Sequence, residues 1–216
     1  MNKKIKSLLL AAVMGLSLTT VAVVPATVEA ASAGAAETLI GGAVAYAYVS
    51  TAFNKMDNSK EGQEQSLDRA KKQTGYLEDS AAQARVQRIM KTLEASPSVK
   101  RSYVVYANPS DDFNAFATVG RVMSVNKGAL DLLDDDELAY VMAHEISHGE
   151  HKDIVNGLKK QVGLSTAVSL AAGGGGNAAI LSNIAGNYME NQVFTMGQEK
   201  AADELGFKIL SESPYN

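Results

Sequence analysis

The sequence predicts an α+β fold that is mostly helical and contains one small β-sheet. Charged residues are spaced among apolar ones at helical intervals between Glu61 and Glu94, and again after Gly197. Two short segments, Arg101–Ala107 and Arg121–Val125, carry the β-branched, aromatic or alternating pattern that is typical of strands. Without its leader the chain has about 186 residues, enough for one sizeable hydrophobic core.

The first 30 residues are typical of a secretory signal peptide. Early lysines precede an apolar run from Leu8 to Val24, Pro25 ends the run, and small residues allow cleavage after Ala30 or Ala33. The alternative is a retained membrane anchor, because a spanning helix needs roughly 17–25 residues and this run is near the lower limit. We expect export to the periplasm or the outside of the cell.

Composition excludes several classes of protein. The chain has no cysteine, which excludes a disulfide framework and a lipid anchor on cysteine. Removal of residues 1–30, which hold three lysines and one glutamate, changes the formal net charge from −4 to −6. This mildly acidic balance argues against a nucleic-acid partner, while peripheral membrane association and the oligomeric state stay open.

The predicted order is a signal peptide at 1–30, an Ala/Gly-rich arm at 31–60 and one folded domain at 61–216. Gly75 divides the helical region before Ser96-Pro97-Ser98 into two helices. Residues 161–187, with four consecutive glycines at 173–176, are expected to form a flexible crossover.

The histidines lie in a predicted helix that ends near Gly149. A short helix at Ala129–Leu133 comes before it. Asp134 then caps the longer helix, and Glu137 at the third position completes a capping box.

All three histidines of the chain fall within eight positions of "AHEISHGEH". His144 and His148 are four residues apart, so they lie on one helix face and can bind one Zn²⁺ per chain. Glu145 lies beside that face, where it can act as a general base on water, as in the H-E-x-x-H motif. The alternative is a pair of histidines on an exposed helix end. His151 is not expected to be a ligand, because the pattern with a third histidine needs it where Ile154 stands.

The third protein ligand is then expected to be a carboxylate, as in two-histidine, one-glutamate zinc sites. Glu199 and Asp203 are four residues apart on the last helix, so one can bind the metal and the other can orient a histidine. Spacing alone does not decide between them. The acidic residues considered downstream are Glu190, Glu199, Asp203, Glu204 and Glu212.

Three segments carry a resemblance to a known family: "NAFA" at 114–117, "GALDLLDDDELAYVMAHEISHGEHKD" at 128–153 and "EKAAD" at 199–203. They resemble the HtpX, BepA and CAAX prenyl protease type of gluzincin, metallopeptidase family forty-eight. The resemblance implies a zincin-like domain in which His144, His148 and Glu199 bind zinc.

The same resemblance makes Glu145 the catalytic base and Asp203 the acid that supports a zinc ligand. It also implies that Asn114, Ala115 and Phe116 belong to an edge strand that aligns substrate. This chain departs from the family after "NAFA", where Thr118–Arg121 replaces a Pro-Gly-Gly type turn, so the substrate subsites are expected to differ there.

The expected function is an extracytoplasmic zinc metalloendopeptidase that hydrolyses unfolded or extended polypeptides, in protein quality control of the cell envelope. The alternative is a zinc-stabilised envelope chaperone or scaffold with little proteolysis. An intact H-E-x-x-H motif argues against it, because a purely structural site has no need of Glu145.

Overall fold

The computed structural model describes residues 46–47, 50–171 and 194–215 of the chain. Two compact units form, one from Met1–Asn54 with Gly157–Asn191 and one from Lys55–Asn156 with Gln192–Asn216. The predicted signal peptide lies outside the described residues. Among the described helices, none combines the length and the apolar character that a membrane crossing requires.

The described part of the first unit is helical. Residues 50–54 are helical, and helix α7 (Asp153–Ala171) begins in the second unit and continues through this one. Lys159 Nζ donates to Asn54 Oδ1 at 2.7 Å. The predicted crossover is therefore wrong for residues 161–171, which are helical. This segment holds a single glycine, and the glycine run begins two residues beyond it; residues 172–187 lie outside the described part.

Two amphipathic helices open the second unit after helical residues 55–58. Helix α3 spans Lys60–Thr74 and helix α4 spans Ser80–Glu94. Ser59 caps α3 by accepting from Gly62 N, and Asp79 caps α4 by accepting from Ala81 N and Ala82 N. Gly75 ends α3 with φ 83°, a conformation that glycine adopts without strain, so the predicted division at this residue is confirmed.

The sheet has three strands: β1 (Val104–Asn108), β2 (Ala115–Thr118) and β3 (Val122–Asn126). Their order is β1-β3-β2, with β1 parallel and β2 antiparallel to β3. Both strands predicted from the pattern are confirmed, with starts shifted by one to three residues. Strand β2 lies at an edge, which leaves one side of it available to other groups.

A tight turn at Gly120 and Arg121 joins β2 to β3, and both residues have positive φ, 86° and 61°. Arginine rarely adopts this conformation. Its side chain holds it there, because Nε donates to Asp57 O at 2.8 Å and Nη1 donates to Ser102 O at 2.9 Å.

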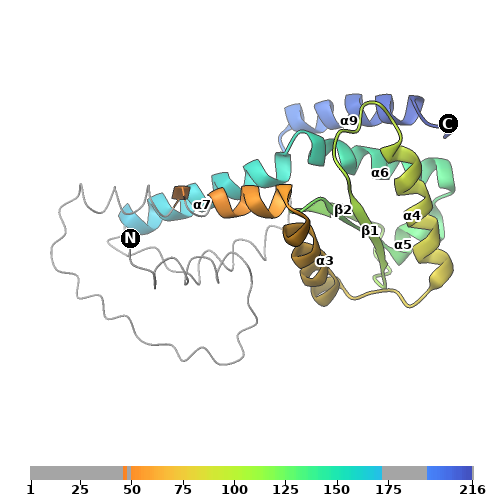
Figure 1. The fold of residues 1–216 in the computed structure, drawn as a ribbon, viewed down its shortest axis with the longest axis horizontal. Helices are drawn as coiled ribbons and strands as arrows, with labels where there is room; N and C mark the ends of the chain where they lie inside the picture. Colours follow the sequence, from red (N-terminus) through yellow and green to blue (C-terminus); the bar gives the residue numbers. More distant parts are fainter. Residues whose placement is uncertain (1–45, 48–49, 172–193, 216) are drawn as a thin grey trace. The chain divides into compact units, whose positions relative to one another are not determined.

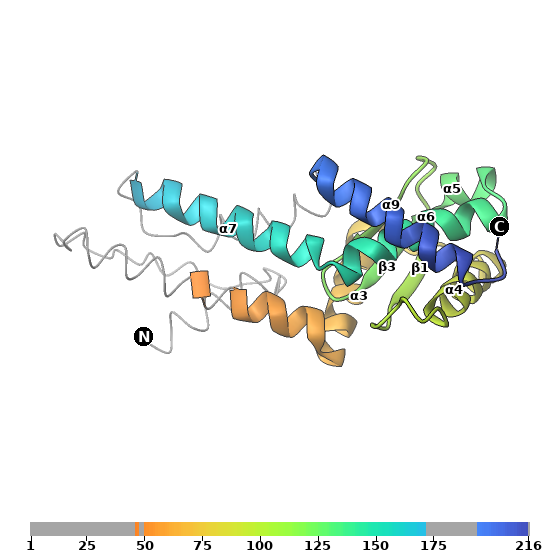
Figure 2. The same cartoon turned by 90° about the horizontal axis from the view of Figure 1, so that it is seen from above.

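Helices cover both faces of the sheet (Figures 1 and 2). Helix α3 contacts β1 and β3 on one face, and α4 with α6 (Asp135–Glu150) contacts the other. The short helix α5 (Lys127–Leu132) follows β3 directly. The core between the sheet, α4 and α6 includes the fully buried Val86, Ile89, Leu93, Met123, Val125, Leu138, Met142 and Ile146.

Helix α9 (Met196–Ser211) lies along α6 (Figures 1 and 2). Gly206 permits this close approach, since a Cβ atom there would lie 3.1 Å from the backbone nitrogen of His144. Ile209 and Leu210 of α9 join the core. The helix that carries the histidines is thus held against the helix that carries the downstream acids.

Candidate metal centre

Helix α6 presents His144 and His148 from a firmly anchored position. Its capping box is present as predicted, with Asp134 accepting from Glu137 N and Glu137 accepting from Asp134 N. Leu138, Met142 and Ile146 on the core-facing side are fully buried and fix the rotation of the helix. Each fully buried side chain of this size contributes roughly 1.5–3 kcal/mol of hydrophobic stabilisation.

The two imidazole rings converge. Their centroids are 4.9 Å apart with an interplanar angle of 78°, and the two Nε2 atoms are 3.2 Å apart. His148 is 1% exposed, whereas the side chain of His144 is 20% exposed. One ring is therefore buried and the other lies at the surface.

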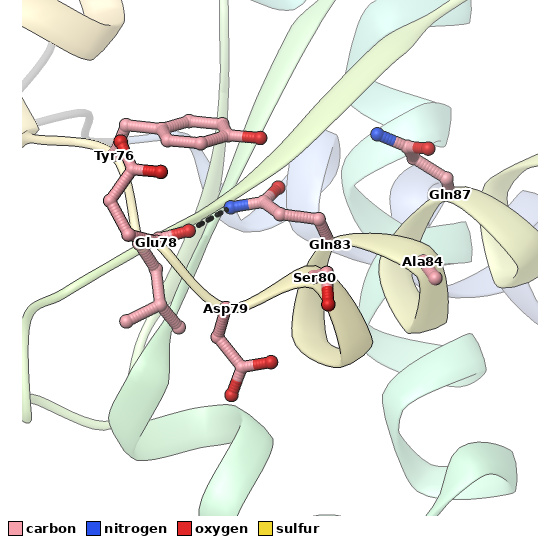
Figure 3. Close-up of a pocket in the computed structure, with 8 residues that line it drawn as sticks. Tyr76, Glu78, Asp79, Ser80, Gln83, Ala84 and Gln87 are labelled. Atoms are coloured by element: carbon pink, nitrogen blue, oxygen red, sulfur yellow. Dashed lines mark hydrogen bonds between the residues drawn. The ribbon is translucent and has the colours of Figure 1, made fainter.

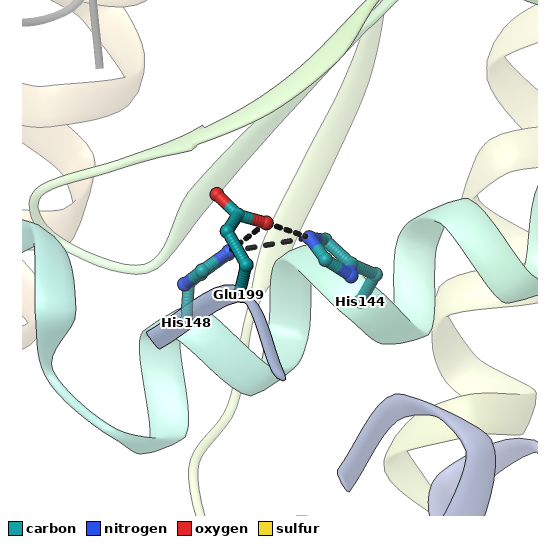
Figure 4. A group of neighbouring side chains, drawn as sticks. All are labelled: His144, His148 and Glu199. Atoms are coloured by element: carbon teal, nitrogen blue, oxygen red, sulfur yellow. Dashed lines mark hydrogen bonds and ion pairs between the residues drawn. The ribbon is translucent and has the colours of Figure 1, made fainter. Parts of the chain in front are cut away.

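Glu199, in the first turn of α9, completes the group (Figure 4). Its Oε2 lies 3.4 Å from His144 Nε2 and 3.8 Å from His148 Nε2. Within the described residues, His144, His148 and Glu199 are the group whose donor atoms all lie within 4.8 Å of one another. In a tetrahedral zinc site with bonds of about 2.0–2.1 Å, neighbouring donor atoms are about 3.3 Å apart. Two of the three separations match this spacing, and the 3.8 Å between His148 Nε2 and Glu199 Oε2 exceeds it by about 0.5 Å, so a small shift of Glu199 brings all three donors to a zinc ion.

Each imidazole contacts a carboxylate through its Nδ1 atom, on the side of the ring opposite Nε2. Asp203 Oδ1 lies 2.9 Å from His144 Nδ1, and Asp153 Oδ2 lies 2.9 Å from His148 Nδ1. Because an ionised carboxylate only accepts hydrogen bonds, each Nδ1 carries the proton and each Nε2 keeps its lone pair. Burial lowers the pKa of His148, while the hydrogen bond to Asp153 acts in the opposite direction.

Glu145 connects α6 to the edge strand of the sheet. Its Oε2 accepts a hydrogen bond from the backbone N–H of Ala117 in β2, at 3.0 Å. Burial raises the pKa of Glu145 to about 7, against the opposing effects of the Ala117 hydrogen bond and of His144. A carboxyl group with a pKa near neutrality can both accept and release a proton at physiological pH.

The expected substrate residues lie on β2 or next to it. Asn114 is exposed and precedes the strand, Ala115 is buried in the strand, and Phe116 is half-buried. The backbone N–H of Asn126 in β3 donates to Asn114 O at 3.0 Å. Asn114 thus pairs with β3 through its carbonyl group, whereas the N–H of Ala117 points to the outer side of β2, where it meets Glu145.

The opposite edge of the sheet is occupied at Ala107 of β1. The side chain of Gln83 donates to Ala107 O at 2.9 Å and accepts from Ala107 N at 3.0 Å, and Leu77 N also donates to Ala107 O at 3.0 Å. Gln83 also donates to Leu77 O at 2.8 Å, beside a hollow of about 410 Å³ (Figure 3). That hollow shares no lining residue with the metal group.

The remaining sequence candidates do not join the group. His151 is exposed and caps the C-terminus of α6. Glu204 is exposed and lies 3.7 Å from Lys200, and Glu212 accepts hydrogen bonds from Ser96 and Ser98. Glu190 lies outside the described residues.

The structure adds three residues that the sequence pattern did not single out. Asp153 reaches His148 from the start of α7, and Gln198 donates to Asp153 Oδ1 at 2.9 Å. The ring of Phe194 stacks on His148 with centroids 3.8 Å apart and an interplanar angle of 14°. A signal for Asp153 was present, since it is an acid five residues after the motif at the beginning of a further helical stretch.

Comparison with known proteins finds one matching family model and several relatives. Residues 77–216 match the model of "Peptidase family M48". Over 59% of its length the chain is 28% identical to the "Beta-barrel assembly-enhancing protease" of Escherichia coli K12, covering 28% of that protein. It is 29% identical to the "Metalloprotease LoiP" of the same bacterium, over 51% of this chain and 45% of that protein. It is 34% identical to a "Protease HtpX homolog" of Salinibacter ruber, over 47% of this chain and 42% of that protein. The matches thus span less than half the length of each relative.

Proposed function

The chain belongs to peptidase family M48, and on that premise we propose that it is a zinc-dependent metalloendopeptidase of the cell envelope. The observation that carries this proposal is the convergence of His144 Nε2, His148 Nε2 and Glu199 Oε2 at spacings of 3.2–3.8 Å. Three protein donors with a fourth position left for water is the arrangement of catalytic rather than structural zinc sites.

Zinc held by His144, His148 and Glu199 would supply a Lewis acid that lowers the pKa of a water molecule to roughly 7 and polarises the scissile carbonyl group. The protein's own part is to hold these donors rigidly. Asp203 fixes the ring of His144, because its Oδ1 accepts a hydrogen bond from the Nδ1–H of that histidine at 2.9 Å.

Glu145 is proposed as the general base and then the general acid. The Ala117 N–H holds Oε2 of its carboxylate at 3.0 Å, which leaves Oε1 to accept the proton of the attacking water. The same carboxyl group then delivers that proton to the leaving amine, so the proton count balances across the reaction.

Extended polypeptide is the substrate class that the sheet supports. Strand β2 lies at an edge next to α6, and an extended peptide can add to such an edge through backbone hydrogen bonds. Such pairing depends little on side chains, which suits unfolded substrates. Gln83 bonds both the carbonyl group and the N–H of Ala107 on the β1 edge, whereas the printed bond on the β2 edge is made by Glu145, the proposed base, to Ala117 N.

Two considerations support a location in the envelope. One relative is named for assembly of β-barrels, and the first residues are typical of a secretory signal peptide. We propose a role in protein quality control there.

The decisive experiment compares wild-type protein, Glu145→Gln and Glu199→Ala in zinc content and casein cleavage. Glu145→Gln should keep its zinc and lose about 10²–10⁴-fold in rate, because it lacks the base. Glu199→Ala should lose zinc and activity together. Glu204→Gln, an exposed change on the same helix, is the control and should behave as wild type.

Full activity of zinc-loaded Glu145→Gln would show that the base is assigned wrongly. A wild-type protein that binds zinc and suppresses aggregation but cleaves nothing would favour the scaffold alternative.

A further inference from the structure

Asp153 is a buried acid placed between two helices. It is the first residue of α7, and its side chain is 10% exposed, compared with 58% for Asp203. Both of its oxygens are engaged: Oδ2 accepts from His148 Nδ1 and Oδ1 accepts from Gln198 Nε2, each at 2.9 Å. Hydrogen bonds to a charged group are stronger when water is excluded, so this acid should constrain its histidine more tightly than the exposed Asp203 does.

Gln198 uses both ends of its amide. Its Oε1 accepts from Thr195 N and from the Thr195 hydroxyl group, each at 3.0 Å, which completes the capping box of α9. Its Nε2 donates to Asp153. A capping box accepts glutamate or glutamine at this position, but glutamate has no hydrogen to donate to Asp153. The contact with Asp153 therefore explains why the residue is glutamine.

The residue after Gln198 is Glu199. The first turn of α9, which presents Glu199, is thus tied through Gln198 and Asp153 to the ring of His148 on α6. One chain of hydrogen bonds thus joins the end of α6 and the start of α7 to the first turn of α9, which lies 45 residues further along the chain.

We propose that Asp153 and Gln198 form a positioning pair that holds His148 with Nε2 free for the metal and aligns Glu199 with it. This inference rests on the proposed metal site, and neither residue touches the metal or the substrate. The pair acts through geometry: loss of the Asp153 acceptor allows the other tautomer of His148, in which Nε2 carries the proton and cannot bind the ion.

The test swaps the hydrogen-bond donor and acceptor between positions 153 and 198 in the full-length chain. In Asp153→Asn one of the two carboxylate oxygens is replaced by an NH2 group, so either the Nδ1–H of His148 or the amide NH2 of Gln198 faces a donor in place of its acceptor. In the double variant Asp153→Asn/Gln198→Glu, the amide introduced at position 153 can accept from His148 with its oxygen and donate to the new carboxylate with its nitrogen. The double variant also keeps the formal net charge of the wild type.

The measurement is Zn²⁺ affinity by competition with a chromophoric chelator, together with the visible spectrum of the Co²⁺-loaded protein. Asp153→Asn should bind Zn²⁺ about 10–100-fold more weakly than wild type, the usual effect of losing a partner of a ligand histidine. The double variant should regain most of that affinity and a wild-type Co²⁺ spectrum. Asp68→Asn/Gln65→Glu, the same pair of changes at exposed positions of α3, should match wild type.

Wild-type affinity in Asp153→Asn, or a double variant that binds no better than this single variant, would overturn the proposal. Urea unfolding of the metal-free proteins separates a folding defect from a metal-site defect. The free-energy loss in Zn²⁺ binding should exceed the loss in the free energy of unfolding of the metal-free variant. The affinity measurement does not depend on peptide cleavage. If the wild type binds Zn²⁺ and shows the predicted pattern but cleaves no casein, the proposed function fails and the positioning pair stands.

Discussion

Glu145 should make the metal-free protein lose stability as the pH rises, and Glu145→Gln should remove that loss. Burial raises the pKa of this carboxyl group from 4.5 to about 7 in the folded chain. The folded state therefore holds the proton more tightly than the unfolded state, and ionisation acts against folding. The effect is absent below pH 4.5, grows between the two pKa values and is complete above pH 7.

The magnitude follows from the two pKa values. The difference between 4.5 and about 7 corresponds to about 3 kcal/mol, of which roughly 2–3 kcal/mol develops between pH 5 and pH 8. The stability of Glu145→Gln relative to wild type should rise by this amount over that range. His148 changes stability in the opposite direction, because burial lowers its pKa and stability is lost as the pH falls. His148 is present in both wild type and Glu145→Gln, so its effect on the free energy of unfolding cancels in the comparison.

The assay is urea unfolding followed by far-ultraviolet circular dichroism in the presence of EDTA, at half-unit steps of pH. Glu64→Gln, an exposed change on α3, controls for the loss of one carboxyl group. Zinc should flatten the pH dependence, because a nearby cation favours the ionised carboxylate. A difference between Glu145→Gln and wild type that stays constant within about 0.5 kcal/mol from pH 5 to pH 8 would refute the reasoning.

Further variants test the packing around the site. Gly206→Val should push α9 away from α6 and weaken zinc binding at least about tenfold, since even its Cβ would lie 3.1 Å from His144 N. Gly197→Val, on the same helix, is the matched control because its Cβ would lie 4.0 Å from the nearest contact, and equal zinc affinity of the two variants would contradict the close approach. Phe194→Leu removes the ring stacked on His148 and should cost about 0.5–1.5 kcal/mol of zinc binding, measured by chelator competition. Met142→Ala should lower the free energy of unfolding by about 2–5 kcal/mol in urea, because the side chain is fully buried; a loss below about 1 kcal/mol would contradict its place in the core.

The sequence by itself determined the parts of the molecule that depend on near neighbours in the chain. The capping box at Asp134 and Glu137, the division at Gly75 and the shared helix face of His144 and His148 follow from residues within a few positions of one another. Helical geometry translates such spacing directly into position. The fold class follows in the same way, from alternating helical and strand patterns.

Only the tertiary structure decided which groups meet across elements. Spacing left Glu199 and Asp203 equivalent, and the packing of α9 on α6 places the first near both Nε2 atoms and the second behind His144 Nδ1. The contact of Asp153 with Gln198 belongs to the same class, because Gln198 lies 45 residues further along the chain, whereas His148 is only five residues away. The rotation and approach of packed helices arise from the summed contacts of many distant residues, and no local pattern records that sum.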